Sequence, residues 1–156
     1  MLEGKSTMTP DEVFDSISLK VNYPLDIKLM PLAKLDNSFY VSGQVAMRNS
    51  ELIAKGLVGI DVSLEVAQEC ARQCAINILG SLKSELGSLN SITHVSRIAV
   101  YVASADGFND QHLVAHGASQ LFLEVFGLEI GAHARTAIGV KSLPLNSPVE
   151  VDAIFQ

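Results

Sequence analysis

The chain has 156 residues, of which 48% are hydrophobic and 18% are charged, with 17 acidic residues against 11 lysines and arginines. A chain of this length can bury one sizeable core, so we expect a single domain over residues 1–156. The formal charge of −6 and the lack of any basic run oppose binding to a phosphate backbone, so no nucleic-acid partner is expected. Charged residues usually make up roughly a quarter of a domain, and their scarcity here suggests that another subunit covers part of the surface.

Residues 1–20 predict a polar N-terminal arm, which carries acidic residues and lacks the apolar core of a secretory signal. No run approaches the roughly eighteen uninterrupted apolar residues of a spanning helix, so no membrane partner is expected. The chain has only two cysteines, which argues against a disulfide framework. We therefore expect a cytoplasmic location.

Two segments in the first half of the chain have clear local signals. Short apolar runs on both sides of Asn37-Ser38 predict a β-hairpin, and Gly43 within its second strand indicates a bulge or a close backbone approach. Residues 63–86 place apolar side chains at intervals of three and four, which predicts an amphipathic helix. Ser63 is the expected N-cap of this helix and Gly87 its expected end.

The second half predicts two further strands, one interior strand and one more helix. Residues 94–104 are rich in β-branched side chains and should form the interior strand. Apolar pairs every four residues predict a helix over residues 109–126, ended by Gly127, and residues 134–140 and 149–156 follow as strands. This order predicts an α+β fold in which two helices cover one face of a mixed sheet.

Two pairs of side chains have a spacing that suits metal ligands. Cys70 and Cys74 lie four residues apart on the predicted first helix, but a zinc site needs further ligands, and their position near the apolar stripe favours packing. His112 and His116 have the same spacing without the glutamate of HExxH, and they lie opposite the apolar stripe. A solvated or partner-facing surface is the better interpretation of the histidines, and no metal is expected.

The most distinctive residue is Arg135, a charge in a strand of small and apolar neighbours. A charge in a strand is costly to bury without a partner, and Glu150 interrupts the last predicted strand in the same way. One interpretation is a structural ion pair between Arg135 and Glu150. The other is a pocket in which Arg135 grips a ligand carboxylate, Glu150 handles a proton or a water, and Ser42 adds a hydroxyl.

The stretches FYVSGQVA and ARTAIGVKSLPLNSPVEVDA, the predicted first helix and the HVSRIAVYVAS strand together resemble the Rid family, also called YjgF-like or endoribonuclease L-PSP-like. The resemblance covers about residues 30–156. Its C-terminal signature is an arginine on a strand, a Leu-Pro before the last strand and a glutamate fifteen residues after the arginine. Arg135, Leu143-Pro144 and Glu150 match all three.

The resemblance implies a chorismate-mutase-like fold, with two helices on one face of a six-stranded sheet. It also implies a homotrimer whose sheets surround a central barrel, with clefts at the subunit interfaces. Well-known members hydrolyse reactive enamines and imines, such as 2-aminoacrylate, to 2-keto acids and ammonia. A small carboxylate-bearing ligand is therefore expected, and no metal or organic cofactor is implied.

Carried over by position, Arg135 pairs with the substrate carboxylate, Glu150 positions the hydrolytic water and Ser42 lines the cleft. Ala137 stands where the deaminase branch of the family has a cysteine, and that branch's cleft tyrosine has no counterpart before Ser42. His112 is the residue nearest to an asparagine that the branch often places early in the second helix. The chain thus resembles a divergent subgroup, to which the identity of the ligand does not transfer.

Three functions are compatible with these residues. The first is a cofactor-independent deaminase of small 2-imino acids, with Arg135 and Glu150 as catalytic residues. The second is a trimer that binds or senses a small carboxylate without turnover. The third, a ribonuclease, follows only from an older family name, and the acidic balance and the lack of a basic, aromatic-rich surface argue against it.

Overall fold

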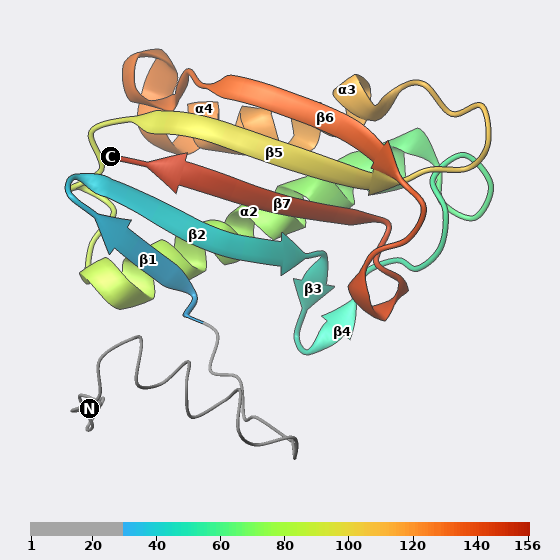
Figure 1. The fold of residues 1–156 in the computed structure, drawn as a ribbon, viewed down its shortest axis with the longest axis horizontal. Coiled ribbons are helices and arrows are strands. Elements are labelled where there is room, and N and C mark those ends of the chain that lie inside the picture. The colour runs from blue at the N-terminus through green and yellow to red at the C-terminus, as the bar shows by residue number, and fades with distance from the viewer. Residues whose placement is uncertain (1–29) are drawn as a thin grey trace, which may run out of the picture.

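The structure of the chain, a computed structural model, describes residues 30–156 and has an α+β fold. Figure 1 shows the two long helices, α2 and α4, on one face of a mixed sheet, while no helix within these residues covers the opposite face. In sheet order the strands are β1 (Leu32–Leu35), β2 (Ser38–Val45), β7 (Val149–Phe155), β5 (Val95–Ala103) and β6 (Ala134–Val140). The helices are α2 (Leu64–Leu86), α3 (Gln111–Val114) and α4 (His116–Gly131).

The main sheet has five strands within residues 30–156, so the sixth strand that the family resemblance implies is not found in this part of the chain. Two short strands, β3 (Met47–Arg48) and β4 (Glu51–Leu52), pair with each other in a separate two-stranded sheet instead. A 3₁₀ turn at Pro144–Asn146 connects β6 to β7. The two main helices and the mixed sheet are as predicted.

The first hairpin forms as predicted, but it turns one residue earlier. Leu35 pairs with Ser38, so Asp36 and Asn37 make the two-residue loop, and Asp36 takes a φ of 51°. Aspartate tolerates this left-handed conformation better than most residues, which places the turn at Asp36 rather than at Ser38. The register of β2 against β7 shifts between Val41 and Gln44, which confirms the irregularity predicted at Gly43.

Helix α2 begins and ends where the sequence predicts. Ser63 caps it by accepting a hydrogen bond from the Val66 N–H at 3.3 Å, and Gly87 ends it with a φ of 78°. Hydrogen bonds from its own backbone N–H and from the Ser63 hydroxyl hold the pKa of the Glu65 carboxyl below its ordinary value. These contacts anchor the start of the helix that covers β2 and β7.

The second helical segment differs from its prediction. It begins at Gln111 rather than 109, breaks at Ala115 between α3 and α4, and runs to Gly131, although Gly127 leaves the helical conformation with a φ of 73°. Gly127 therefore interrupts the helix, as expected, without ending it. Where α4 crosses α2, a Cβ at Gly117 would overlap the backbone oxygen of Gln68, so only glycine permits this close packing.

Residues 111–131 together are long and apolar enough to cross a membrane by length and composition, with a mean hydropathy of 1.2. A count of uninterrupted apolar residues does not reveal this, because polar residues are interspersed along the segment. Leu121 and Phe122 of this segment are buried, and the Phe122 ring meets the Phe155 ring edge-on at 5.6 Å. This is the packing of an amphipathic helix that covers a sheet.

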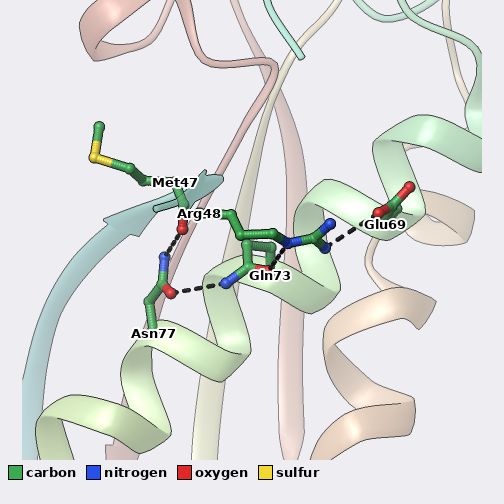
Figure 2. Close-up of polar contacts among 5 residues, drawn as sticks. All are labelled: Met47, Arg48, Glu69, Gln73 and Asn77. Atoms are coloured by element: carbon green, nitrogen blue, oxygen red, sulfur yellow. Dashed lines mark hydrogen bonds and ion pairs between the residues drawn. The ribbon is translucent and has the colours of Figure 1, made fainter. Parts of the chain in front are cut away.

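A cluster of polar side chains joins β3 to α2 (Figure 2). Arg48 donates to the Gln73 Oε1 at 2.9 Å and to the Glu69 Oε1 at 3.1 Å, and Gln73 in turn donates to the Asn77 Oδ1 at 2.9 Å. Asn77 then donates to the backbone oxygen of Met47 at 2.9 Å. Because these groups satisfy one another, the cluster is a structural connection between the small sheet and the helix layer.

Candidate functional site

Arg135 lies on the edge strand β6, where it pairs with Ile98 of β5. Ile98 is fully buried under the helices, so Arg135 leaves the sheet on the helix side, and its Nη1 donates to the Ser119 hydroxyl of α4 at 3.1 Å. Among residues 30–156 the ion pairs are Arg48–Glu69 and Arg72–Glu124, and Arg135 takes part in neither. Its guanidinium is therefore exposed and not neutralised within the described chain.

A cleft of about 300 Å³ opens beside this guanidinium. Its wall combines apolar side chains with one cation, one hydroxyl and one imidazole. The lining residues are Ser119, Leu123, Leu128, Ala132, His133 and Arg135. A site of this kind suits a small anion with an apolar portion, because Arg135 supplies two parallel donors and the leucines supply apolar contact.

Two of these lining residues, Ser119 and His133, form a hydrogen-bonded chain that ends at Arg135. His133 Nδ1 lies 2.6 Å from the carbonyl oxygen of Gly131, and its Nε2 lies 2.9 Å from the Ser119 Oγ. A carbonyl can only accept, so in the neutral ring Nδ1 carries the proton and Nε2 accepts from the Ser119 hydroxyl. The Ser119 oxygen in turn accepts from Arg135.

Neither Ser119 nor His133 was identified from the sequence. His133 lies two residues before Arg135, so strand alternation alone could have placed both side chains on one face. Ser119 had no comparable local signal, because its contact with Arg135 depends on how α4 packs beside β6.

Glu150 lies on β7, on the opposite face of the sheet. It pairs with Tyr101 of β5 and with Val45 of β2. A Cβ at Gly43 would overlap Glu150 Oε1, so the absence of a side chain at Gly43 leaves the space that the carboxylate occupies. Burial, and then the nearby Asp152 carboxylate, raise the pKa of Glu150 above its ordinary value.

The predicted ion pair between Arg135 and Glu150 is wrong within one chain. Strand β5 separates β6 from β7, and the partners of the two residues on β5 are Ile98 and Tyr101. These partners are an odd number of positions apart, so their side chains point to opposite faces. A structural ion pair within one chain is therefore excluded, and the two charges belong to two separate surfaces of the subunit.

The other two predicted site residues divide between these surfaces. Ala137 lies two positions after Arg135, on the same face, and packs half-buried against the core. Ser42 lies beside Gly43 in the bulge and donates its hydroxyl to the Met30 oxygen at 2.6 Å. We call Arg135 and Ala137 the arginine side of the site, and Ser42 and Glu150 the glutamate side.

The cysteines are buried, free and packed in the core, in agreement with the packing interpretation. Burial raises the pKa of the Cys70 thiol to about 12 and also raises the pKa of the Cys74 thiol. His112 is exposed and His116 half-buried. No group of three or more His, Cys, Asp or Glu side chains that could hold a metal ion occurs within residues 30–156.

Comparisons with known proteins agree with this architecture. A family model described as "YjgF/chorismate_mutase-like, putative endoribonuclease" matches residues 27–155. Protein TCP17 of Trypanosoma cruzi is 38% identical over 117 residues, which cover 75% of this chain and 73% of that protein.

Two solved structures extend the comparison to the fold. The structure of Atu1372, a protein of unknown function from Agrobacterium tumefaciens, is 42% identical with a TM-score of 0.81, over 90% of this chain and 88% of that one. A "putative endoribonuclease" from Shewanella oneidensis, 24% identical, shares the fold with a TM-score of 0.80 over 96% and 99% of the two chains. The matched residues include the whole C-terminal signature of Arg135, Leu143-Pro144 and Glu150, and the chain belongs to the YjgF/chorismate mutase-like family, the Rid family that its sequence resembles.

Proposed function

We propose that this protein is a cofactor-independent hydrolase, which deaminates small enamines and imines to 2-keto acids and ammonia in a cleft between subunits. The observation that carries the proposal is the exposed Arg135 guanidinium, which faces a cleft of about 300 Å³ and has no carboxylate partner within residues 30–156. The planar fork of arginine is the protein group best suited to grip a small carboxylate through two hydrogen bonds.

The complete site requires a second copy of the chain. Arg135 and Glu150 leave the sheet on opposite faces, so they can act on one substrate only if they come from different subunits. The sheet face that carries no helix in Figure 1 exposes Tyr40 and Ile138, whose relative exposures are 43% and 45%. These two exposed apolar side chains and the edge of β6, which is unpaired within residues 30–156, both favour assembly, and we propose the homotrimer of the family resemblance.

In the proposed reaction the arginine side of the site orients the substrate and the glutamate side activates the water. The Arg135 guanidinium holds the substrate carboxylate and so fixes the position of the imine carbon. The Glu150 carboxylate of a neighbouring copy takes a proton from a water whose oxygen attacks that carbon, while the C=N π pair moves to the nitrogen, and Ser42 lines the same side. Glu150 passes the proton to the nitrogen, and a second transfer from the new hydroxyl lets the C=O bond form as the C–N bond breaks and ammonia leaves. The raised pKa of Glu150 makes its carboxylate a stronger base for this step. The proposed mechanism requires no metal or organic cofactor.

The test is the hydrolysis of enzymatically generated 2-iminopropanoate by the wild type and by Arg135→Ala and Arg135→Lys. We expect Arg135→Ala to lower kcat/KM by about 100-fold or more, since the guanidinium orients the substrate, and Arg135→Lys to retain part of the activity. Arg72→Ala is the matched control, because Arg72 pairs with Glu124 at the helix surface. Unchanged hydrolysis in Arg135→Ala would show that the catalytic proposal is wrong.

A second candidate is a trimer that binds a small carboxylate without turnover. Ala137 favours this candidate, because the deaminase branch of the family that the sequence resembles has a cysteine at this position and this chain lacks it. It predicts that a 2-keto acid raises the Tm in an Arg135-dependent way while 2-iminopropanoate is not consumed. RNA cleavage is favoured only by names, those of the matched family and of some solved relatives, and the net charge of −6 opposes it.

A further inference from the structure

We propose that Ser119 and His133 form a proton-transfer pair, which interconverts the keto and enol forms, or the enamine and imine forms, of a small 2-keto or 2-enamino acid. The inference rests on the proposed carboxylate cleft, because it uses Arg135 as the anchor, but it does not depend on hydrolysis. The proposed step is a tautomerisation, in which a proton is moved to or from C3 of the ligand. This step is separate from the attack of water on the imine carbon.

The hydrogen-bond geometry defines the direction of proton transfer. The Gly131 carbonyl fixes the proton of the neutral ring on His133 Nδ1, so Nε2 faces the Ser119 hydroxyl as a base at 2.9 Å. Arg135 Nη1 donates to the same Ser119 oxygen at 3.1 Å, which stabilises negative charge as the hydroxyl proton leaves. A hydroxyl between a base and a fixed cation is prepared to exchange a proton with a bound ligand.

The position of the pair relative to the anchor identifies the ligand atom. The Ser119 hydroxyl accepts a hydrogen bond from the guanidinium that would hold the carboxylate. The third carbon (C3) of a 2-keto acid lies only two bonds from the carboxylate carbon, so C3 is the atom expected to lie beside Ser119. Within the described lining of the cleft, His133 is the only imidazole, and its Nε2 is the nitrogen that can accept a proton from the Ser119 hydroxyl. The exposed Leu128 and half-buried Leu123 provide apolar contact for a short aliphatic side chain.

The proton and electron balance closes without another reactant. In the keto direction the Ser119 oxygen takes a proton from C3 while its own proton passes to His133 Nε2. The C3–H electron pair forms the C2=C3 bond, and the carbonyl π pair moves to the keto oxygen to give the enolate. The proton held by His133 then passes back through Ser119 to that oxygen, which completes the enol and restores the neutral pair. In the reverse sense the pair returns a proton to C3 of a 2-enamino acid, whose nitrogen lone pair forms the C=N bond of the iminium.

The experiment measures deuterium incorporation at C3 of 2-ketobutyrate in D₂O by proton NMR, with binding of 2-ketobutyrate followed by calorimetry. We expect the wild type to exceed the protein-free rate and Ser119→Ala and His133→Gln to lose about 100-fold or more of that excess, since positioned acid–base groups contribute roughly 10² to 10⁴. A glutamine in place of His133 can accept a hydrogen bond from Ser119 but cannot take its proton.

Binding separates the chemical role from a structural one. Ser119→Ala and His133→Gln should bind 2-ketobutyrate within a few-fold of the wild type, whereas Arg135→Ala should lose both binding and exchange. Ser119→Thr keeps a hydroxyl and should retain part of the exchange. Ser84→Ala and His94→Gln, at exposed positions of α2 and the start of β5, are the matched controls and should exchange like the wild type.

Each contrary outcome has a distinct meaning. A wild type that binds 2-ketobutyrate without exchange, or exchange that persists in Ser119→Ala, overturns the proton-transfer pair and leaves the carboxylate cleft intact. A wild type that neither binds nor exchanges overturns both this inference and the proposed function.

Discussion

Arg135 and Glu150 flank the same strand, β5, yet their side chains leave the sheet on opposite faces, because one pairs with Ile98 and the other with Tyr101. Within a single chain this arrangement prevents contact between the two charges. Direct contact between them therefore requires two copies of the chain, so strong energetic coupling becomes a test of assembly.

The first prediction is that Arg135 and Glu150 are coupled in the assembled protein and uncoupled in a dissociated subunit. A double-mutant cycle with Arg135→Ala and Glu150→Gln, measured on chemical unfolding, should give a coupling of about 0.5 kcal/mol or more in the assembly. Analytical ultracentrifugation fixes the oligomeric state at each concentration. If the two substitutions changed the free energy of unfolding additively in a confirmed trimer, Arg135 and Glu150 of neighbouring copies would not be in contact.

The second prediction concerns the pH dependence of stability at Glu150. Burial and the Asp152 carboxylate raise its pKa in the folded state, so the folded protein favours the protonated form. The stabilisation from this preference is present below the ordinary glutamate pKa of 4.5 and is lost as pH rises through the raised value. In an Arg135→Ala background, Glu150→Gln should therefore increase the free energy of unfolding at pH 7, and the gain should disappear at pH 4.

Urea unfolding of the single variant Arg135→Ala and of the double variant that adds Glu150→Gln, at both pH values, measures this difference. The Arg135→Ala background removes the guanidinium that a neighbouring copy would bring to the Glu150 carboxylate. The pKa of Glu150 is then raised by burial and by the Asp152 carboxylate without an opposing positive charge from Arg135. Equal stability of the single and double variants at pH 7 would contradict a raised pKa.

The third prediction is that Gly43→Ala impairs the reaction more than it impairs folding. The added Cβ would overlap Glu150 Oε1, which is the end of a flexible side chain and can move aside. We expect a loss of unfolding free energy of about 1 kcal/mol, near the low end for overpacking, and a fall in kcat of about 10-fold or more as Glu150 is displaced.

Gly80→Ala provides the matched control for this substitution. Gly80 lies on the exposed surface of α2, and a Cβ there meets no atom of residues 30–156 within 4 Å, so alanine should stabilise the helix by about 0.5–1 kcal/mol. Hydrolysis should be unchanged in Gly80→Ala. A Gly43→Ala protein with wild-type kcat would show that the position of the Glu150 carboxylate is not critical.

The sequence predicted the bounds of helices and strands well where those bounds depend on neighbouring residues. The Ser63 cap, the Gly87 end and the alternation of residues 134–140 gave correct bounds for α2 and β6, because caps and alternation depend on neighbours in sequence. The break at Ala115 was missed, since the apolar stripe is nearly continuous across it.

The arrangement of the site depended on contacts between distant parts of the chain. The sequence shows that Arg135 and Glu150 are unusual, but only the order β7-β5-β6 and the register on β5 reveal that they face opposite ways. Ser119 joins Arg135 through the packing of α4 against the edge of the sheet, and no spacing rule connects residues 119 and 135.

The last prediction is that neither cysteine reacts in the folded protein. Burial raises the pKa of the Cys70 thiol to about 12 and also raises the pKa of the Cys74 thiol, whose Sγ lies 3.6 Å from the Val149 oxygen. Since the thiolate is the reactive form, iodoacetamide at pH 8 should label neither thiol in native protein and both in urea. Mass spectrometry over a urea series should show labelling that rises with the unfolding transition. Fast labelling of Cys70 by iodoacetamide without urea would mean that α2 opens locally. That result would contradict the interpretation of both cysteines as core residues that solvent does not reach.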